Sequence, residues 1–340
     1  MNTLFNTESH GSRFVFPLVV IAALFLPFVL SGYETFQATQ ILIYAMVLLG
    51  LNMLTGFNGQ ISLGHGAFFA IGAYVAALLM DQFGMVYWLT LPIAGLACLV
   101  FGFLFGLPAL RLDGLYLALM TFAFGVVVPQ VLRHKSIGEW TGGVEGLMLT
   151  KPEAPFGLPL TADQWLFFFT LAITVVMFVI GKNLLKGRIG RAWLAVRDHP
   201  VAAASMGINT AFYKTAAFGV SAMYTGVAGA LSAIVVAYVA PDSFTPFLSI
   251  SLLVGIVVGG LATISGAIYG AIFIQIVPNL AASVSQAAPW AVYGLLLLLF
   301  TLAMPGGIAG LVNKVFSWTS FRRPLLTENQ PSVPKPDVKA

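Results

Sequence analysis

Charged side chains are scarce in this sequence. Only 8% of its 340 residues are Asp, Glu, Lys or Arg, whereas 59% are hydrophobic, and a soluble domain normally carries about 25% charged residues. Water would not solvate such a surface, so much of it must face lipid. The shortage of charge therefore excludes an ordinary soluble protein. Together with long charge-free runs, it predicts an all-α polytopic membrane protein.

Groups that could hold a metal or perform catalysis are also few. The single cysteine, Cys98, lies in an apolar run and cannot form an internal disulfide, and the four histidines lie in unrelated places. No Cys/His spacing indicates a metal ion. The stretch Gly181-Lys182-Asn183 lacks both the upstream glycine and the Mg²⁺-binding hydroxyl of a phosphate loop. We therefore expect no catalytic residue, no metal and no bound ATP in this chain, and a membrane-embedded enzyme is disfavoured.

Two further functions lack the residues that they need. The basic residues fall in separate loops without interleaved aromatic residues, so no nucleic-acid partner is expected. Intramembrane carboxylates normally mark ion and proton pathways, and none lies in the middle of an expected helix. A self-contained secondary transporter or channel is therefore the weaker alternative, because the energy for transport would have to come from another protein.

Apolar runs divided by charges or by Gly-rich breaks set the number of membrane spans. A spanning helix needs about 20 residues. The run after Arg13 exceeds a signal-peptide core and ends in no convincing cleavage site, so we expect an uncleaved first helix. About ten helices are predicted. They lie at 14–33, 35–80 (two helices divided at 56–60), 87–110, 114–132, 164–181, 215–241 and 243–313 (three helices).

The basic residues orient these spans. With ten helices and both termini in the cytoplasm, all but three of the 16 basic residues lie inside, as the positive-inside rule requires. The exceptions, Arg133, Lys135 and Lys151, lie in a long outside loop. The expected parts are a cytoplasmic N-terminus (1–13), a transmembrane domain (14–313) with an outside loop (133–163) and a cytoplasmic loop (182–214), and a disordered cytoplasmic tail (314–340).

The cytoplasmic loop predicts two short helices. Ile189, Trp193 and Val196 are spaced for one helical face. Pro200 then favours the start of a new helix, which Gly207 ends. A basic edge beside small alanines is typical of a surface on which another protein docks, although a basic loop that merely obeys the positive-inside rule remains an alternative. The candidate docking residues are Arg188, Arg191, Arg197, Asp198, Ala202, Ala203 and Gly207.

Polar residues and glycines around position 60 indicate a broken helix. Backbone groups that a break frees can line a cavity and bind a zwitterion without any fixed charge. The alternative is that these side chains form hydrogen bonds between helices. The candidates for a translocation path are Asn52, Asn58, Gln60, Ser62 and His65.

Glycines four residues apart predict close contact between helices. These pairs are Gly102 with Gly106, Gly255 with Gly259, Gly266 with Gly270, and Gly306 with Gly310.

Four stretches of sequence resemble a known family. Residues 197–208 resemble the cytoplasmic coupling region of ATP-binding-cassette importer permeases, with Arg-Asp, Ala-Ala and Gly-Ile in the family's order. The stretches 50–74, 111–119 and 259–267 are similar to the branched-chain amino acid permeases of the LivM type. Pro200 departs from the pattern, since many relatives carry an acidic residue there.

The resemblance implies a set of partners and a cargo. It implies a second permease of the LivH type, two cytoplasmic ATPase subunits that bind ATP and Mg²⁺, and a periplasmic or lipid-anchored solute-binding protein. It also implies a multi-pass protein of the bacterial inner membrane that imports branched-chain or related amino acids by alternating access. Urea, short amides and aromatic acids are the alternative cargoes for the same architecture.

Overall fold

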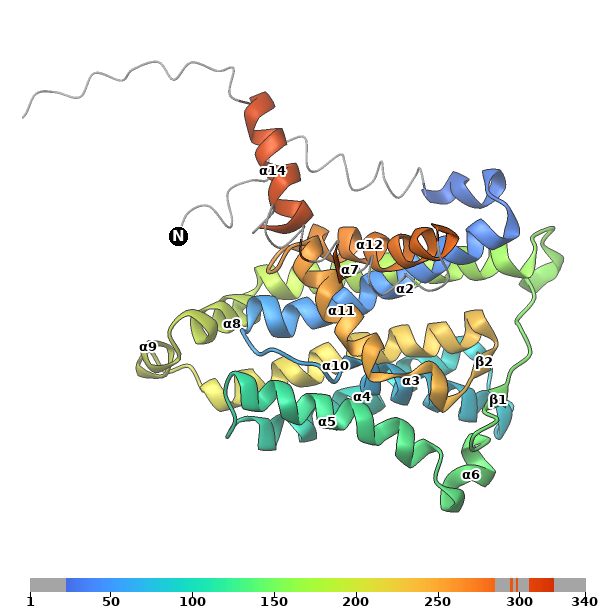
Figure 1. The fold of residues 1–340 in the computed structure, drawn as a ribbon, viewed down its shortest axis with the longest axis horizontal. Coiled ribbons are helices and arrows are strands. Elements are labelled where there is room, and N and C mark those ends of the chain that lie inside the picture. The colour runs from blue at the N-terminus through green and yellow to red at the C-terminus, as the bar shows by residue number, and fades with distance from the viewer. Residues whose placement is uncertain (1–22, 285–293, 296–297, 299–305, 321–340) are drawn as a thin grey trace, which may run out of the picture.

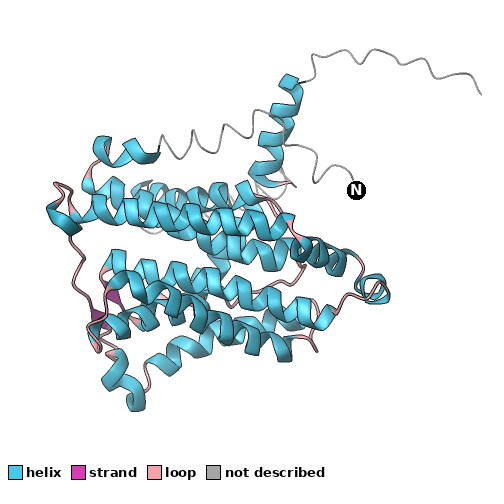
Figure 2. Cartoon of the chain, turned by 180° about the vertical axis from the view of Figure 1, so that it is seen from behind, coloured by secondary structure: helices cyan, strands magenta, loops and turns pink. Residues whose placement is uncertain are grey.

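Helices dominate the computed structural model, which describes residues 23–284, 294–295, 298 and 306–320 (Figure 1). Seen from behind, the same helices lie side by side, with two very short strands at one end (Figure 2). The helices are α2 (Gly32–Asn52), the π-helix η1 (Met53–Phe57), α3 (His65–Asp81), α4 (Tyr87–Ala109), α5 (Leu115–Leu132), α6 (Lys135–Thr141), α7 (Ala162–Lys186), α8 (Arg188–Asp198), α9 (Pro200–Ser205), α10 (Thr210–Val236), α11 (Pro246–Gly259), α12 (Ile264–Val284) and α14 (Gly307–Ser320). Two 3₁₀ turns, η2 (Pro155–Gly157) and η3 (Pro241–Ser243), and strands β1 (Leu147–Met148) and β2 (Tyr238–Val239) are also present. Residues 23–29, ahead of α2, are helical as well.

Helix α10 lies at the centre of the bundle. It packs against α4, α3 and α2, while α7, α11 and α12 pack against α2. Helix α5 lies along an edge of the bundle and contacts α3 and α11 (Figure 1). Large side chains such as Phe218 and Tyr224 are fully buried on α10. The core therefore forms around the helix that follows the α8–α9 pair in the chain.

The described residues contain most of the expected spans. Six helices are long and apolar enough to cross a membrane, and α3 and α12 contain shorter apolar stretches. They correspond to eight of the ten expected spans. Residues 14–22 of the first expected span and most of 285–305 lie outside the described residues, so the count of ten stays a prediction. The prediction of an all-α polytopic membrane protein is confirmed, and the sides on which the termini lie stay a prediction.

Several predicted helix ends were wrong. Helix α7 continues to Lys186 rather than ending at residue 181, and α10 begins at Thr210, ahead of Lys214. Exposed lysines do not end a helix, because their long side chains reach the polar surroundings while the backbone stays helical. The predicted outside loop contains the helix α6, and α14 runs to Ser320, so residues 314–320 of the predicted disordered tail are helical.

Three of the four predicted glycine pairs lie at close helix contacts. Gly255 and Gly259 on α11 face Gly270 and Gly266 on α12, and Gly102 on α4 lies against Ala222 on α10. The prediction was wrong for Gly310, because among the described residues no atom of another segment lies near the place where its Cβ would be. The pattern alone does not distinguish a packed glycine from an open one.

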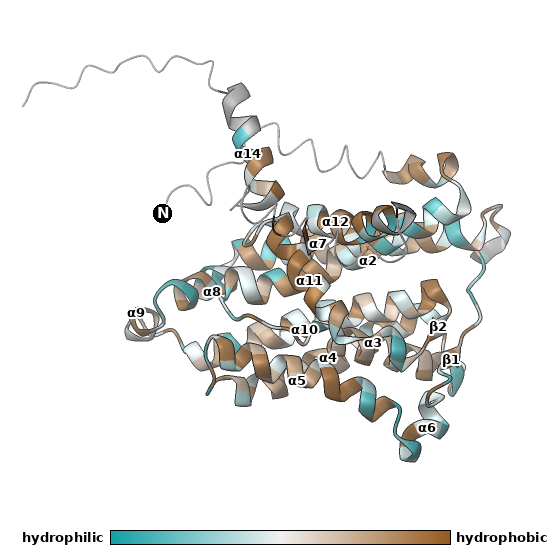
Figure 3. Cartoon of the chain, viewed as in Figure 1, coloured by the Kyte–Doolittle hydropathy of each residue, from teal (hydrophilic) through white to brown (hydrophobic). Residues whose placement is uncertain are grey.

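Hydrophilic residues gather at the two ends of the bundle (Figure 3). At the α9 end, Lys214 pairs with Asp113 of the α4–α5 turn at 3.2 Å. At the β1–β2 end, Lys151 pairs with Asp163 at the start of α7, and Arg133 pairs with Asp242. The α9 end bears the basic residues Arg111, Lys182, Lys186, Arg188, Arg191, Arg197 and Lys214. The β1–β2 end has more acidic residues than the basic Arg133, Lys135 and Lys151, so the two ends differ in the sign of their charge. These acidic residues are Glu34, Asp81, Glu139, Glu145, Glu153, Asp163 and Asp242.

Candidate functional site

The two helices α8 and α9 project from one end of the bundle (Figure 1). Trp193 of α8 is fully buried, and its indole Nε1 donates a hydrogen bond to the Tyr213 carbonyl of α10 at 3.0 Å. Pro200 begins α9, and Gly207 follows it with φ +83°, the left-handed conformation that glycine adopts without strain. The helices lie where the sequence predicts them, and the buried indole anchors the pair on α10.

The tip formed by α9 exposes apolar side chains. Val201 is 79% exposed and Met206 is 83% exposed, and Ala202 is also exposed. Ala203, by contrast, is only 4% exposed, so it faces the bundle and does not belong to the exposed surface. We call Val201, Ala202, Ala204 and Met206 the α9 tip. Apolar side chains grouped at a polar end of a protein typically mark a surface that another protein covers.

The basic residues beside the α9 tip differ in what they contact. Arg188 and Arg191 are exposed, and the Arg191 guanidinium donates to the Lys186 carbonyl at 3.1 Å. The Arg197 side chain instead turns toward the bundle: its Nε donates to Asp198 Oδ1 at 2.9 Å and its Nη1 to the Gly56 carbonyl at 2.7 Å. The structure therefore divides the predicted basic edge into an exposed part and an internally bonded part.

A break in the helix between α2 and α3 follows the π-helix η1. The Asn58 N–H donates to the Met53 carbonyl, five residues earlier, and Gly59 then has φ +82°. Residues 58–64 are not helical, and α3 begins only at His65. Non-helical backbone inside a membrane protein is tolerated where protein buries it or where it lines a cavity. The predicted broken helix is therefore present.

Asn52 fastens the end of α2 to the turn between α11 and α12. Its Oδ1 accepts from the Ala262 N–H at 2.9 Å, and its Nδ2 donates to the Thr263 carbonyl at 2.7 Å. Ala262 has φ +57°, a strained conformation for alanine that these two bonds help to hold. In this structure the Asn52 amide bonds to the backbone of another segment.

Asn58 and Gln60 form a second polar pair. Gln60 Nε2 donates to Asn58 Oδ1 and, at 3.1 Å, to the Lys214 carbonyl at the start of α10. Asn58 is 2% exposed, and in the described part of the chain its Nδ2 has no hydrogen-bond partner. A buried amide without a partner loses its hydration without compensation. Asn58 is thus the candidate path residue that keeps an unused donor.

His65 lies in a network that joins three segments. Its Nδ1 is 3.0 Å from Ser62 Oγ, and its Nε2 is 2.6 Å from Ser221 Oγ on α10. Ser221 Oγ in turn donates to the Gly50 carbonyl on α2 at 2.6 Å. Because Ser221 uses its only proton on Gly50, we assign the His65 proton to Nε2. Both ring nitrogens then have partners within the protein.

The Ser221→Ala variant is expected to destabilise the protein. It removes two buried hydrogen bonds and leaves His65 Nε2 without a partner, at a cost of about 1–3 kcal/mol for that group, whereas the Gly50 carbonyl keeps its backbone bond from the Met53 N–H. A lower thermal unfolding midpoint in detergent would measure this loss. Ser205→Ala on α9 is the matched control, because Ser205 Oγ bonds only to the Val201 carbonyl one turn earlier at an exposed position, so its midpoint should stay close to that of the wild type.

Sequence reasoning missed the partners of the broken helix. The Thr121 hydroxyl on α5 accepts from the Leu63 N–H at 3.0 Å, and the Ser249 hydroxyl on α11 accepts from the Gly66 N–H at 2.9 Å. These hydroxyls satisfy backbone groups that the break has freed. A lone Ser or Thr within an apolar helix is the only signal for them in the sequence, and it is weak.

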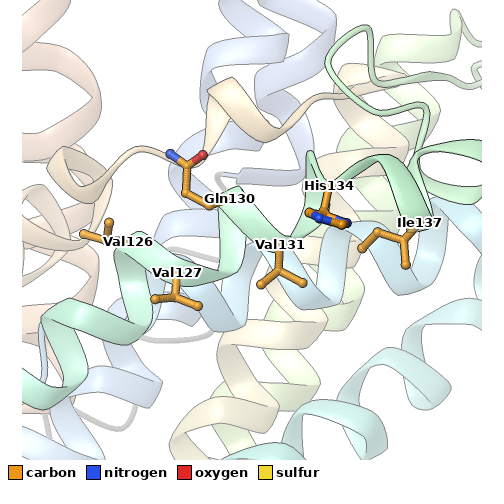
Figure 4. A pocket seen from close by; sticks show the side chains of 6 residues that line it. All are labelled: Val126, Val127, Gln130, Val131, His134 and Ile137. Atoms are coloured by element: carbon orange, nitrogen blue, oxygen red, sulfur yellow. The ribbon is translucent and has the colours of Figure 1, made fainter.

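A shallow apolar groove of about 400 Å³ runs along the end of α5 and the start of α6 (Figure 4). Its lining residues are Val126, Val127, Gln130, Val131, His134 and Ile137. None of the predicted site residues lines this groove. Among the residues that the structure describes, no group of three or more His, Cys, Asp or Glu side chains could hold a metal ion.

The apolar bundle, its interrupted helix and its two ends of unlike charge define a multi-pass α-helical membrane protein. Comparison with known proteins makes this specific. The chain belongs to the family described as branched-chain amino acid transport system / permease component, whose profile matches residues 35–304. This is a family of transport permeases, so the prediction that the chain is not an enzyme is confirmed.

Individual relatives of two kinds resemble the chain. The high-affinity branched-chain amino acid transport system permease protein LivM of Escherichia coli (strain K12) is 36% identical over 287 residues, covering 77% of this chain and 67% of the relative. LivM of Salmonella typhimurium matches to the same extent. LivH of Escherichia coli (strain K12) is 24% identical over 288 residues, covering 78% of this chain and 91% of the relative. No solved structure matches the chain.

Proposed function

We propose that this chain is the membrane-spanning permease subunit of an ATP-driven importer for branched-chain or related amino acids. The family and the names of the relatives support the class of transporter and its cargo. In this proposal the chain itself binds no ATP. Partner ATPase subunits hold ATP and Mg²⁺, and the chain converts their closure into alternating access of a path for the solute.

The exposed α9 tip is the observation that carries the proposal. Val201 and Met206 are among the most exposed large apolar side chains of the described residues, and they lie beside the exposed cations Arg188 and Arg191. An apolar centre with a polar rim is the usual composition of a protein interface. The occupant that we propose for this tip is an ATPase subunit, and the buried Trp193 anchors the tip so that a push on it reaches α10.

The charge of the two ends supports an orientation. The α9 end carries most of the basic residues of the described bundle, and loops rich in Lys and Arg stay in the cytoplasm. We therefore propose that α8 and α9 lie in the cytoplasm with both chain termini, and that the β1–β2 end faces the periplasm. The membrane would be the inner membrane of a bacterium.

For the solute path we propose the non-helical segment 58–64. Asn58 keeps an unused buried donor, and the Ile61 side chain of the same segment is exposed on the bundle. Freed backbone and amide groups bind a zwitterion without fixed charge. Asn52, Gln60, Ser62 and His65 use their polar groups on protein partners, so in this proposal they hold the shape of the path rather than contact solute.

The partners follow from the same reasoning. Relatives of both the LivM and the LivH kind support a second, related permease beside this chain. The proposal adds two ATPase subunits and a solute-binding protein on the periplasmic side.

Purification of the tagged chain from its native membrane in mild detergent tests this function. We expect mass spectrometry to find a second permease and ATPase subunits in stoichiometric amounts. A chain that is recovered without any ATPase, under conditions that preserve a known importer of this kind, would contradict the proposal.

A further inference from the structure

The Arg197 side chain connects α8 to the broken helix. It is 26% exposed, and its Nη1 reaches the carbonyl of Gly56, 141 residues earlier in the chain, at 2.7 Å. Gly56 lies in the last turn of η1, where carbonyls run out of backbone N–H partners. A cation at that position satisfies the carbonyl and complements the negative end of the helix dipole.

Gly59 provides the space for this connection. A Cβ at position 59 would lie 2.7 Å from Arg197 Cγ, and the φ of Gly59 is +82°. Any larger residue would both strain the backbone and push the arginine stem away. The stem therefore lies directly on the start of segment 58–64 while the guanidinium holds η1.

The other side of η1 is also fixed. A Cβ on Gly56 would collide with Asn52 Oδ1 and with the Ala262 N–H, so η1 lies against the turn that joins α11 to α12. Beyond η1, Gln60 bonds to the Lys214 carbonyl at 3.1 Å. A movement of α8 thus has a direct mechanical connection to η1, to segment 58–64 and to the α11–α12 turn.

We propose that Arg197 is a positioning residue that transmits the movement of α8 and α9 to segment 58–64, and that it is not a docking contact for the ATPase. The inference rests on the proposed function, because it assumes that an ATPase moves the α9 tip. Its basis is that both ends of the guanidinium are used inside the chain, on Gly56 and on Asp198. Arg191 differs because its side chain is exposed and its guanidinium donates to the nearby Lys186 carbonyl, not to a distant segment of the bundle.

The test uses the full transporter, with both permeases and the ATPases, in lipid nanodiscs. Ile61→Cys in a Cys98→Ala background provides a single thiol on segment 58–64, and its rate of labelling by a maleimide reports the local conformation. The rate is measured without nucleotide and after trapping with ATP and vanadate. With Arg197 present, we expect trapping to change the rate by about tenfold, a typical size for coupling between two sites.

Arg197→Gln should abolish the nucleotide-dependent change in the labelling rate of the cysteine at position 61, while the ATPase subunits still bind. We expect the labelling rates with and without nucleotide to agree within about twofold, with basal ATP hydrolysis retained. Arg197→Lys should restore part of the change, because it keeps the charge but loses the planar guanidinium. Arg111→Gln removes an exposed arginine at the same end of the bundle and should leave the change intact.

Gly59→Ala tests the same connection from the other side. It should reduce the nucleotide-dependent change in labelling rate, as Arg197→Gln does. The double variant should lose no more of that change than Arg197→Gln alone, because both substitutions break the same connection. A full nucleotide-dependent change in Arg197→Gln overturns the inference. So does loss of ATPase binding in that variant alone, since Arg197 would then be a docking contact. Failure of the unsubstituted chain to bind any ATPase would instead overturn the proposed function.

Discussion

Met206→Glu is expected to abolish ATP-driven uptake while the protein still folds and inserts. Met206 is 83% exposed at the α9 tip, so a glutamate there costs the isolated chain almost nothing. In the complex, however, the carboxylate would be buried in an apolar interface, which weakens binding by about 2 kcal/mol or more, roughly 30-fold. Co-purification of the ATPase subunits and uptake in membrane vesicles measure the loss.

Met148→Glu is the matched control for this variant. Met148 is 84% exposed, but it lies on β1 at the opposite end of the bundle (Figure 1). We expect it to retain the ATPase subunits, so co-purification of the ATPase is the readout on which the two variants are compared. If Met206→Glu also keeps its ATPase subunits and its uptake, the α9 tip does not dock an ATPase.

The Gly72→Val variant is expected to lose the folded state. Gly72 of α3 lies directly against the backbone of Gly226 on α10, and a Cβ there would overlap the Gly226 carbonyl. Backbone on both sides cannot move aside as a flexible side chain would, so overpacking costs about 3 kcal/mol or more. The measurements are the yield of monodisperse protein in size-exclusion chromatography and its thermal unfolding midpoint.

Gly310→Val is the matched control for Gly72→Val, because it adds the same side chain at a glycine that no other described segment contacts. Gly310 lies in α14, and no atom of the described chain outside its own neighbourhood comes near the position of a Cβ there. Gly310→Val should therefore change the stability by less than about 1 kcal/mol. Equal loss of protein in both variants would mean that the α3–α10 contact is not what decides the outcome at Gly72.

Local chemistry made the α8–α9 pair predictable from sequence. Pro200 cannot continue the preceding helix, and Gly207 ends the next one, so the break and both short helices follow from residues close in the chain. The position of the broken helix is likewise evident from Gly56, Gly59 and Gly64. The helix ends of α7 and α10 were not predictable from charge, since a lysine on a helix extends its charge away from the apolar surface.

Long-range contacts set the roles of individual side chains, and the sequence does not reveal them. Ala202 and Ala203 are neighbours on one short helix, yet only Ala203 is buried, because the face that meets the bundle depends on how α9 packs. From the sequence Arg197 belongs to a basic edge, but in the structure its guanidinium donates to the carbonyl of Gly56, in a helix much earlier in the chain. From the sequence His65 is a candidate path residue, but in the structure its Nε2 forms a hydrogen bond with Ser221 on α10.

Reconstituted transport tests the central claim most directly. The purified complex of this chain with its second permease and ATPase subunits is placed in vesicles with ATP on the ATPase side and the solute-binding protein on the other. Radiolabelled leucine, isoleucine and valine are then supplied together. The account predicts accumulation of label that requires both ATP and the binding protein. Accumulation by vesicles that contain this chain alone, without ATP, would contradict it.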